Sequence, residues 1–149
     1  MEIIIKEFKA LSTLQLFEIY QLRSEVFIVE QSCAYQDVDG IDLKAEHLLL
    51  MEAETLAAYA RIIPPGISYK EPSIGRVVVK KQFRGKDLGK ILMKECLKYM
   101  VNEPYKNKDI VISAQSYLIK FYTDLGFKAE GEGYLEDDIP HTKMRFKPV

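Results

Sequence analysis

Cysteine is scarce in this chain, and the two that occur are far apart. Cys33 and Cys96 form neither a C-x-x-C motif nor a Cys/His spacing. Zinc sites and disulfide frameworks in small proteins depend on close, repeated cysteine spacing. The sequence therefore predicts neither kind of site. We expect two inert thiols in a reducing cytoplasm.

Long apolar runs are also missing. No stretch approaches the about 18 consecutive apolar residues that a membrane-spanning helix needs, and the N-terminal MEIIIKEF reaches charged residues within a few positions. We expect a soluble cytoplasmic protein that does not engage a membrane. Internal repeats, low-complexity tracts and linkers are absent too. A chain of 149 residues is in the usual range of one domain, so we predict one domain over residues 1–149.

Net charge is nearly absent, at −1, but it is unevenly distributed. Six basic residues against Asp87 give positions 80–94 a net charge of +5, so the remainder carries −6. A short basic segment on an acidic body favours a compact polyanion over a nucleic-acid backbone. Only Phe83 lies among these basic residues, whereas single strands bind to several interleaved aromatics. Nucleic acid is not expected as a partner, and the alternative is a solvated, lysine-rich helix face.

The hydrophobic pattern predicts strands mixed with helices. We expect strands at 2–8, 47–51, 56–63, 74–79, 109–114, from 127 onward and at 142–146. Helices are expected over roughly 15 residues from Ser12, from near Asp87, and as a short helix at 117–125. The first helix is expected to bury Leu14, Phe17, Tyr20 and Val26 or Phe27. The strand-helix-strand order over 74–114 implies a parallel strand pair joined by a right-handed crossover.

The segment from Ile74 to Met93, IGRVVVKKQFRGKDLGKILM, joins a β-branched strand, a cationic loop with Gly85 and a helical pattern. Such a unit presents unpaired backbone N–H groups and the positive end of a helix to an anion. A P-loop is excluded, because Gly85-Lys86 is followed by Asp87 and not by Ser or Thr. The three-glycine dinucleotide fingerprint is absent as well. The pattern predicts a phosphorylated ligand of another kind.

The chain resembles the GCN5-related N-acetyltransferases (GNAT). The resemblance rests on IGRVVV, on QFRGKDLG from Gln82 to Gly89 and on FYTDLGF from Phe121 to Phe127. The ElaA-type subgroup is similar in VFIVEQSCAYQDVDGIDL from Val26 to Leu43, in His47-Leu48, in AYARI at Ala58 to Ile62 and in DDIPH at Asp137 to His141. The resemblance covers nearly the whole chain. It implies a mixed α/β fold, with a mostly antiparallel central sheet, a parallel strand pair around the cofactor and flanking helices.

The same resemblance implies that the basic loop holds coenzyme A. Backbone N–H groups of Arg84, Gly85, Lys86, Asp87, Leu88 and Gly89 would receive the pyrophosphate, and Val77, Val78 and Val79 would offer main-chain groups to the amide arm. Asp87 stands where the family prefers glycine. Its side chain could cap the helix, but its charge beside a pyrophosphate must be offset by nearby cations.

Tyr122 is the candidate general acid, because the family places the Tyr of this motif near the thioester sulfur. A phenol with a pKa of about 10 can protonate a departing thiolate. The alternative is a buried aromatic that packs the short helix. The resemblance also implies attack of a neutral amine on the acetyl carbonyl, with the oxyanion met by a backbone N–H of the strand near Val79.

The general base stays open. Many family members place a Glu on the strand where this chain has Arg76. The candidates from the loops are Glu30, Asp37, Asp39, His47 and His141, and a chain of waters is another. A His that enters a strand, as His47 does, is more often a structural hydrogen-bonding residue. The acidic loop from Glu30 to Asp42 either attracts a cationic amine or holds solvated turn carboxylates.

We therefore predict an acetyl-CoA-dependent N-acyltransferase that acts on a primary amine of a small molecule or peptide, as a monomer or homodimer. Tyr122, His47 and Glu30 are the catalytic candidates, and no metal is involved. The alternative is a non-catalytic acyl-CoA-binding regulatory domain whose acidic loops contact a protein partner. The charge of Asp87 in the loop and the lack of an obvious base favour that alternative.

Overall fold

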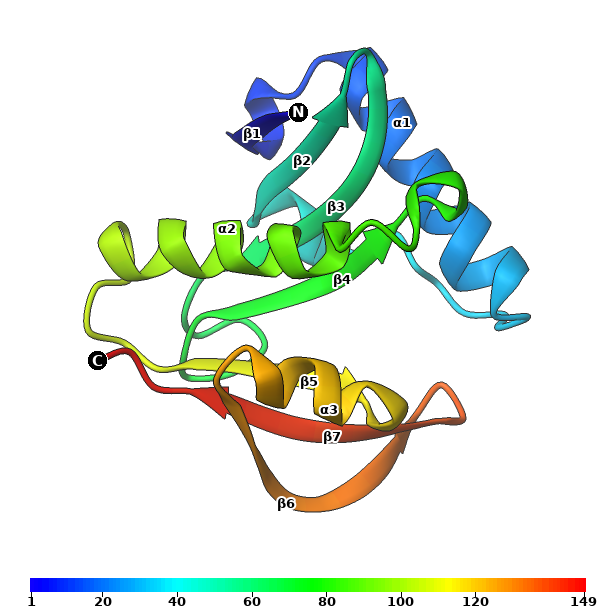
Figure 1. The fold of residues 1–149 in the computed structure, drawn as a ribbon. Coiled ribbons are helices and arrows are strands. Elements are labelled where there is room, and N and C mark those ends of the chain that lie inside the picture. Colours follow the sequence, from blue (N-terminus) through cyan, green and yellow to red (C-terminus); the bar gives the residue numbers. More distant parts are fainter.

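The computed structural model describes all residues from 1 to 149 and divides the strands between two antiparallel sheets (Figure 1). In chain order the elements are β1 (Glu2–Glu7), α1 (Thr13–Arg23), β2 (Glu46–Glu52), β3 (Thr55–Ile63), β4 (Ser73–Val79), α2 (Leu88–Asn102), β5 (Ile110–Gln115), α3 (Ile119–Asp124), β6 (Phe127–Glu136) and β7 (Ile139–Phe146). The strand orders are β1-β2-β3-β4 and β5-β7-β6. This arrangement confirms the predicted mixed α/β class.

The first sheet is covered on both faces. On β2, Leu48 and Leu50 belong to the cluster packed with α2, whereas Leu49 belongs to the cluster packed with α1. Ala58 and Tyr59 on β3 divide in the same way. Because successive strand residues point to opposite faces, two covered faces require an almost continuous apolar run. Figure 1 shows α2 crossing in front of β3.

Helix α1 begins where the sequence predicts. The Ser12 hydroxyl accepts a hydrogen bond from Gln15 N at 3.1 Å, and the Gln15 side chain accepts one from Ser12 N at 2.9 Å. This reciprocal capping box satisfies two N–H groups that a helix start leaves unpaired. Beyond Arg23 the helix continues as a π-helical segment, Ser24–Glu30, in which carbonyls accept from N–H groups five residues ahead.

The predicted apolar face of α1 was wrong in part. Leu14 and Phe17 are 65% and 60% exposed. The buried stripe instead follows Ile19, Leu22 and Val26, which keep the helical spacing of three and four residues. The helix carries two apolar stripes, and the sheet covers the one that continues into the π-helical segment.

The two sheets meet at β4 and β5 without forming one sheet. No ladder joins these strands, and a single hydrogen bond, from Val111 N to Pro72 O at 3.0 Å, links the regions where they begin. The predicted parallel pair is thus adjacent but splayed. A bulge at Arg76, where φ is +51°, shifts the register between β3 and β4, and such a bulge bends the strand that carries it.

The second sheet is built from longer strands than the sequence indicated. β6 and β7 are paired through a hairpin whose turn residues, Asp137 and Asp138, both have positive φ. Helix α3 ends before Gly126, whose φ of +104° matches its predicted role as a C-terminal glycine. None of the helices combines the length and the apolar content needed to cross a lipid bilayer.

Candidate functional site

A cleft of about 720 Å³ opens where β4 and β5 splay apart. Val77, Val78 and Val79 line it from the first sheet, together with Arg84 and Gly89, and Tyr122 lines it from α3. A second hollow of about 410 Å³ lies at the start of α2 and shares Val79, Arg84, Gly89 and Phe121 with the cleft. The strand, the loop and the tyrosine that the sequence singled out therefore lie around adjoining cavities.

One wall of the cleft is a free strand edge. β4 pairs only with β3, so the backbone groups on its other edge are not used by a sheet. One of its carbonyls is taken locally, because Arg84 Nε donates to Val79 O at 3.1 Å. The remaining groups of this edge are available to an extended ligand, as edge strands are in peptide-binding proteins.

The loop before α2 leaves the start of that helix open. Gly85 has a φ of +81°, and a Cβ placed there would meet no atom within 4 Å. Asp87 stands at the N-cap position with φ +60°, but its side chain caps no N–H of the helix. Asp87 therefore occupies the expected N-cap position, but its side chain does not make the expected capping hydrogen bond. Its left-handed backbone explains why glycine suits this position.

Glu30 is paired with the loop rather than free. Arg84 donates to both of its carboxylate oxygens, at 2.6 and 3.0 Å, which ties the end of the π-helical segment to the segment before α2. This hydrogen-bonded guanidinium lowers the pKa of Glu30, and a lower pKa makes a carboxylate a weaker proton acceptor. The geometry argues against Glu30 as the general base.

Tyr122 packs in the core and lines the cleft at once. Its ring meets Phe121 and Phe127 edge to face, with centroid distances of 5.0 and 5.8 Å. Burial, with smaller contributions from Tyr117 and Cys96, raises the pKa of its phenol. The hydroxyl therefore keeps its proton at neutral pH, as a general acid must. The packing role and the acid role are compatible at this position.

His47 lies in β2, buried and outside the lining of the cleft. Its Nδ1 is 2.7 Å from the Tyr59 hydroxyl and its Nε2 is 2.9 Å from Asp42 O. Burial lowers the pKa of the ring and so favours its neutral form. With both nitrogens engaged and no access to a ligand, His47 is not placed to act as a base, and the structural alternative fits.

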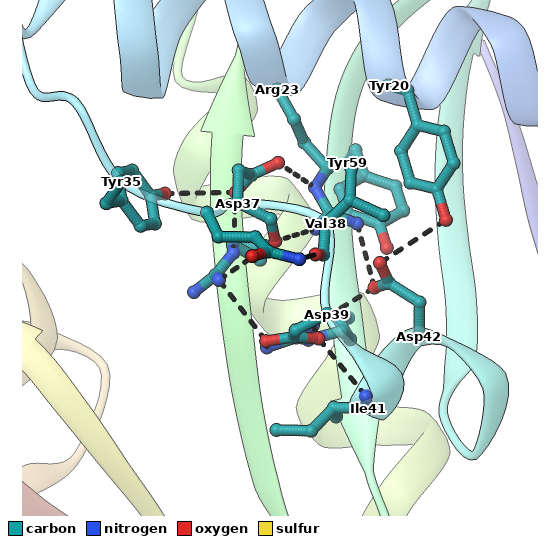
Figure 2. Close-up of polar contacts among 12 residues, drawn as sticks. Tyr20, Arg23, Tyr35, Asp37, Val38, Asp39, Ile41, Asp42 and Tyr59 are labelled. Atoms are coloured by element: carbon teal, nitrogen blue, oxygen red, sulfur yellow. Dashed lines mark hydrogen bonds and ion pairs between the residues drawn. The ribbon is translucent and has the colours of Figure 1, made fainter.

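The carboxylates of the acidic loop are paired with arginines, and only Glu30 and Asp39 keep appreciable exposure, so neither expectation describes the whole loop. Its aspartates form a network with three arginines from α1, β3 and β4 (Figure 2). The members are Asp37, Asp39 and Asp42 with Arg23, Arg61 and Arg76. The charges balance, so the loop presents little net negative charge to a ligand.

Arg23 is the centre of this network and is 0% exposed. It donates to Asp37 Oδ2 and to Asp42 Oδ1, each at 2.8 Å. Burial alone would raise the pKa of Asp42, but hydrogen bonds and charges from Arg23 and Arg61 outweigh it, and the net pKa is lowered. Arg76 lies at the bulge of β4 and holds Asp37 and Asp39. The loop is thereby fastened to the strand that lines the cleft.

The second sheet supplies a polar wall that sequence reasoning largely missed. His141 and Glu136 line the cleft there with Ser113, and Tyr69 joins them from the segment before β4. Ser113 Oγ donates to Glu136 Oε1 at 3.2 Å. The sequence feature that could have revealed part of this wall is the hairpin. Strands joined by the short turn Asp137-Asp138 place Glu136 close to His141.

Cys33 also belongs to the cleft lining. Its Sγ lies 3.6 Å from Asp137 O, and nearby Gln115 Nε2 donates to Gln31 Oε1 at 3.3 Å. The chain after the π-helical segment therefore reaches the second sheet. Only Cys96 of the two thiols is buried. No group of three or more His, Cys, Asp or Glu side chains is arranged to hold a metal ion.

Comparison with known proteins shows which family has this architecture. The family model described as an acetyltransferase (GNAT) domain matches residues 15–148. The chain belongs to the GNAT acetyltransferase family. A UPF0039 protein of Schizosaccharomyces pombe is 43% identical to this GNAT member over 148 residues, covering 99% of this chain and 97% of the relative.

Two solved structures agree with this assignment. An acyl-CoA N-acyltransferase from Pseudomonas aeruginosa has a TM-score of 0.91 and 39% identity, over 97% of this GNAT chain and 98% of its own. ElaA of Escherichia coli has a TM-score of 0.90 and 38% identity, over 99% and 100% of the two chains. The predicted GNAT membership and the ElaA-type resemblance are both confirmed, and the family indicates acyl transfer.

Proposed function

We propose that this protein transfers an acetyl group from acetyl-CoA to a primary amine. The observation that carries the proposal is that the free edge of β4, the uncapped start of α2 and Tyr122 line adjoining cavities. Family membership supports the reaction class. The amine would enter beside the polar wall of the second sheet, since the β4 edge and the loop are assigned to the other substrate.

The residues present fit coenzyme A. A pyrophosphate suits the first turn of α2, which has no side-chain cap, because unpaired N–H groups and the helix dipole favour an anion. Gly85 leaves the approach open. Bound acetyl-CoA would supply the acyl group as an activated thioester. Val77, Val78 and Val79 would hold its amide arm by backbone hydrogen bonds, and Tyr122 holds a proton for a leaving group.

Isothermal calorimetry with acetyl-CoA, followed by thiol release in the presence of primary amines, tests this proposal. We expect one binding site per chain and thiol release that depends on the amine. Two variants of one ion pair sharpen the binding test. Arg84→Ala removes a cation from the loop and is expected to weaken binding, whereas Glu30→Ala frees the same guanidinium and should not weaken it. Absence of acetyl-CoA binding to the wild type would refute the proposal.

One observation favours the non-catalytic alternative. The polar residue of β4 is Arg76, and its guanidinium is engaged by Asp37 and Asp39 rather than available to a substrate. However, the loop carboxylates that the alternative assigns to a protein partner are paired within the chain. Binding of acetyl-CoA without thiol release across a broad amine panel would support a regulatory domain.

A further inference from the structure

His141 has one ring nitrogen fixed by the backbone and one directed to a carboxylate. Its Nδ1 lies 2.7 Å from Ile139 O, and its Nε2 lies 3.5 Å from Glu136 Oε2. Because a carbonyl oxygen only accepts hydrogen bonds, Nδ1 carries the hydrogen. The lone pair of the neutral ring is therefore on Nε2. His141 is 7% exposed, and it is part of the cleft lining.

The other histidine has the opposite arrangement. His47 Nε2 faces the carbonyl of Asp42, so that nitrogen carries the hydrogen, and Nδ1 accepts from the Tyr59 hydroxyl. The two imidazoles of the chain thus differ in tautomer and in access to the cleft. Of the two, only His141 lies on the cleft wall, and its Nε2 has no hydrogen-bond donor from the chain.

The other base candidates are engaged elsewhere. Glu30 is held by Arg84, while Asp37 and Asp39 are held by Arg76 and by further arginines. A carboxylate paired with a guanidinium is a poor proton acceptor. An imidazole has an ordinary pKa of about 6.5, near the operating pH that general-base catalysis prefers.

We propose that His141 is the proton acceptor for the amine substrate, with Glu136 stabilising the imidazolium that forms. This inference rests on the proposed acyl transfer. The Nε2 lone pair forms a bond to one hydrogen of the ammonium group, and the electrons of the broken N–H bond stay on nitrogen as the lone pair that attack requires. The positive charge moves to the ring beside the Glu136 carboxylate, and the proton then leaves to solvent.

The surroundings of the ring are suited to this step. From β6, Tyr134 stacks on it, with centroids 6.2 Å apart, and Glu136 contributes the carboxylate. From β5, the residue paired with His141 is the uncharged Gln115. The other titratable groups of this part of the cleft lining are Tyr69, which interacts with Tyr134 and Glu136, and Tyr117, Asp137 and Cys33. The charged partner in contact with the ring is thus an anion, which favours the protonated product of the transfer.

The tautomers can be measured without any substrate. Long-range ¹H–¹⁵N correlation spectra of the full chain, labelled with ¹⁵N-histidine, will contain signals from two imidazoles only. We expect the neutral form of His141 to carry its hydrogen on Nδ1 and that of His47 on Nε2. The spectrum of His141→Gln lacks the His141 signals, so comparison with the wild type assigns each set of signals to its histidine. A neutral His141 with its hydrogen on Nε2 would overturn the inference, because Nε2 would then donate to Glu136 and could not accept a proton from the amine.

Kinetics then test the role itself. Thiol release from acetyl-CoA is followed against pH with ethanolamine, cadaverine and glycinamide. We expect His141→Gln to lower kcat/KM by about 10²- to 10⁴-fold and to remove the fall of activity in acid, while acetyl-CoA affinity by calorimetry is unchanged. Glu136→Gln removes the carboxylate beside the imidazolium and should also lower kcat/KM, with acetyl-CoA affinity unchanged. His47→Gln is the matched control and should keep the wild-type profile.

The outcomes separate this inference from the proposed function. A wild type that is active while His141→Gln matches its rate and pH profile overturns the role of His141 alone. A wild type that binds no acetyl-CoA, or releases no thiol with any of the three amines, overturns the proposed function and the base together. Thermal unfolding of His141→Gln close to that of the wild type ensures that a lost rate reflects the missing imidazole.

Discussion

Tyr122 combines packing in the core with a place on the cleft wall, as the proposed acid role requires. Its ring is part of the core, between Phe121 and Phe127, and it also lines the cleft. Burial keeps its pKa high and its phenol protonated. The sequence motif located this tyrosine; the structure shows the packing that was one of its two interpretations, and the acid role stays a prediction.

Removal of the Tyr122 hydroxyl should affect turnover and leave binding intact. We expect Tyr122→Phe to lower kcat by about 10²-fold or more, because a general acid contributes about 10²–10⁴, with no change in acetyl-CoA affinity. Stopped-flow thiol release and calorimetry measure the two quantities. Tyr105→Phe removes a hydroxyl outside the cleft and serves as the control. Equal losses in both variants would contradict an acid role for Tyr122.

Asp87 should weaken the binding of the phosphate groups. Its carboxylate lies at the positive end of α2 without capping it, so it competes electrostatically with an anion. We expect Asp87→Asn to bind acetyl-CoA roughly two- to fivefold more tightly, which corresponds to about 0.3–1 kcal/mol. Asn tolerates the left-handed backbone as Asp does. Calorimetry at low salt measures the change.

A matched control is available in the β6–β7 turn. Asp138 has a φ of +62° and does not line either cavity. Asp138→Asn makes the same chemical change at a similar backbone conformation and should leave the affinity unaltered. Weaker binding by Asp87→Asn would show instead that this carboxylate assists the ligand.

Among the elements, the loop between α1 and β2 depends most on partners distant in sequence. Asp42 binds Arg23 and Arg61, which come from α1 and β3. Its acidic residues were visible in the sequence, but their partners were not, because no local spacing relates a loop aspartate to an arginine on another element. The strands and helices were predictable because their apolar periodicity is local.

Loss of one carboxylate from this network should be severe. Asp42→Asn leaves two buried guanidinium groups short of negative charge, and removal of one partner of a buried ion pair costs about 3–5 kcal/mol. Urea unfolding monitored by circular dichroism gives the free energy of unfolding. Asp124→Asn is the comparison, since Asp124 pairs with Lys120 at 61% and 88% exposure. That exposed pair should contribute less than about 1 kcal/mol. A small loss for Asp42→Asn would mean that water reaches the network.

At the scale of the whole molecule, the division into two sheets was the feature that sequence patterns did not reveal. The order strand, helix, strand correctly predicted that β4 and β5 would be neighbours. Whether neighbours form a ladder depends on the bulge at Arg76 and on the loop that holds this arginine. The cleft follows from that long-range arrangement, so the local hairpin pattern could place Glu136 close to His141 but not bring either of them opposite β4.

The stability of the whole chain should fall in mild acid because of His47. Its folded pKa lies below the about 6.5 of the unfolded chain, so the unfolded state binds a proton that the folded state excludes. Its contribution is therefore complete above about pH 6.5 and decreases as the pH falls toward the folded pKa. Urea unfolding at pH 7.5, 6.5 and 5.5 measures this change.

Two histidine variants distinguish the source of that dependence. His47→Gln should flatten the curve between pH 7.5 and 5.5, whereas His141→Gln should retain the decrease. Carboxylates contribute little in this range, because their unfolded pKa values are about 4. A decrease that persists in His47→Gln would assign the acid sensitivity to another group.

The splay of β4 and β5 also bears on aggregation. Unpaired strand edges are the usual starting points for β-aggregation, and this fold keeps two of them on facing walls of a cleft, which a strand of another chain would have to enter in order to pair. The outer edges are β1, which carries Lys6, and β6, which carries Lys128 and Glu132 and is irregular between Glu130 and Tyr134. Charge and irregularity on an edge discourage pairing with other chains. The opening that admits a ligand therefore adds little aggregation-prone surface.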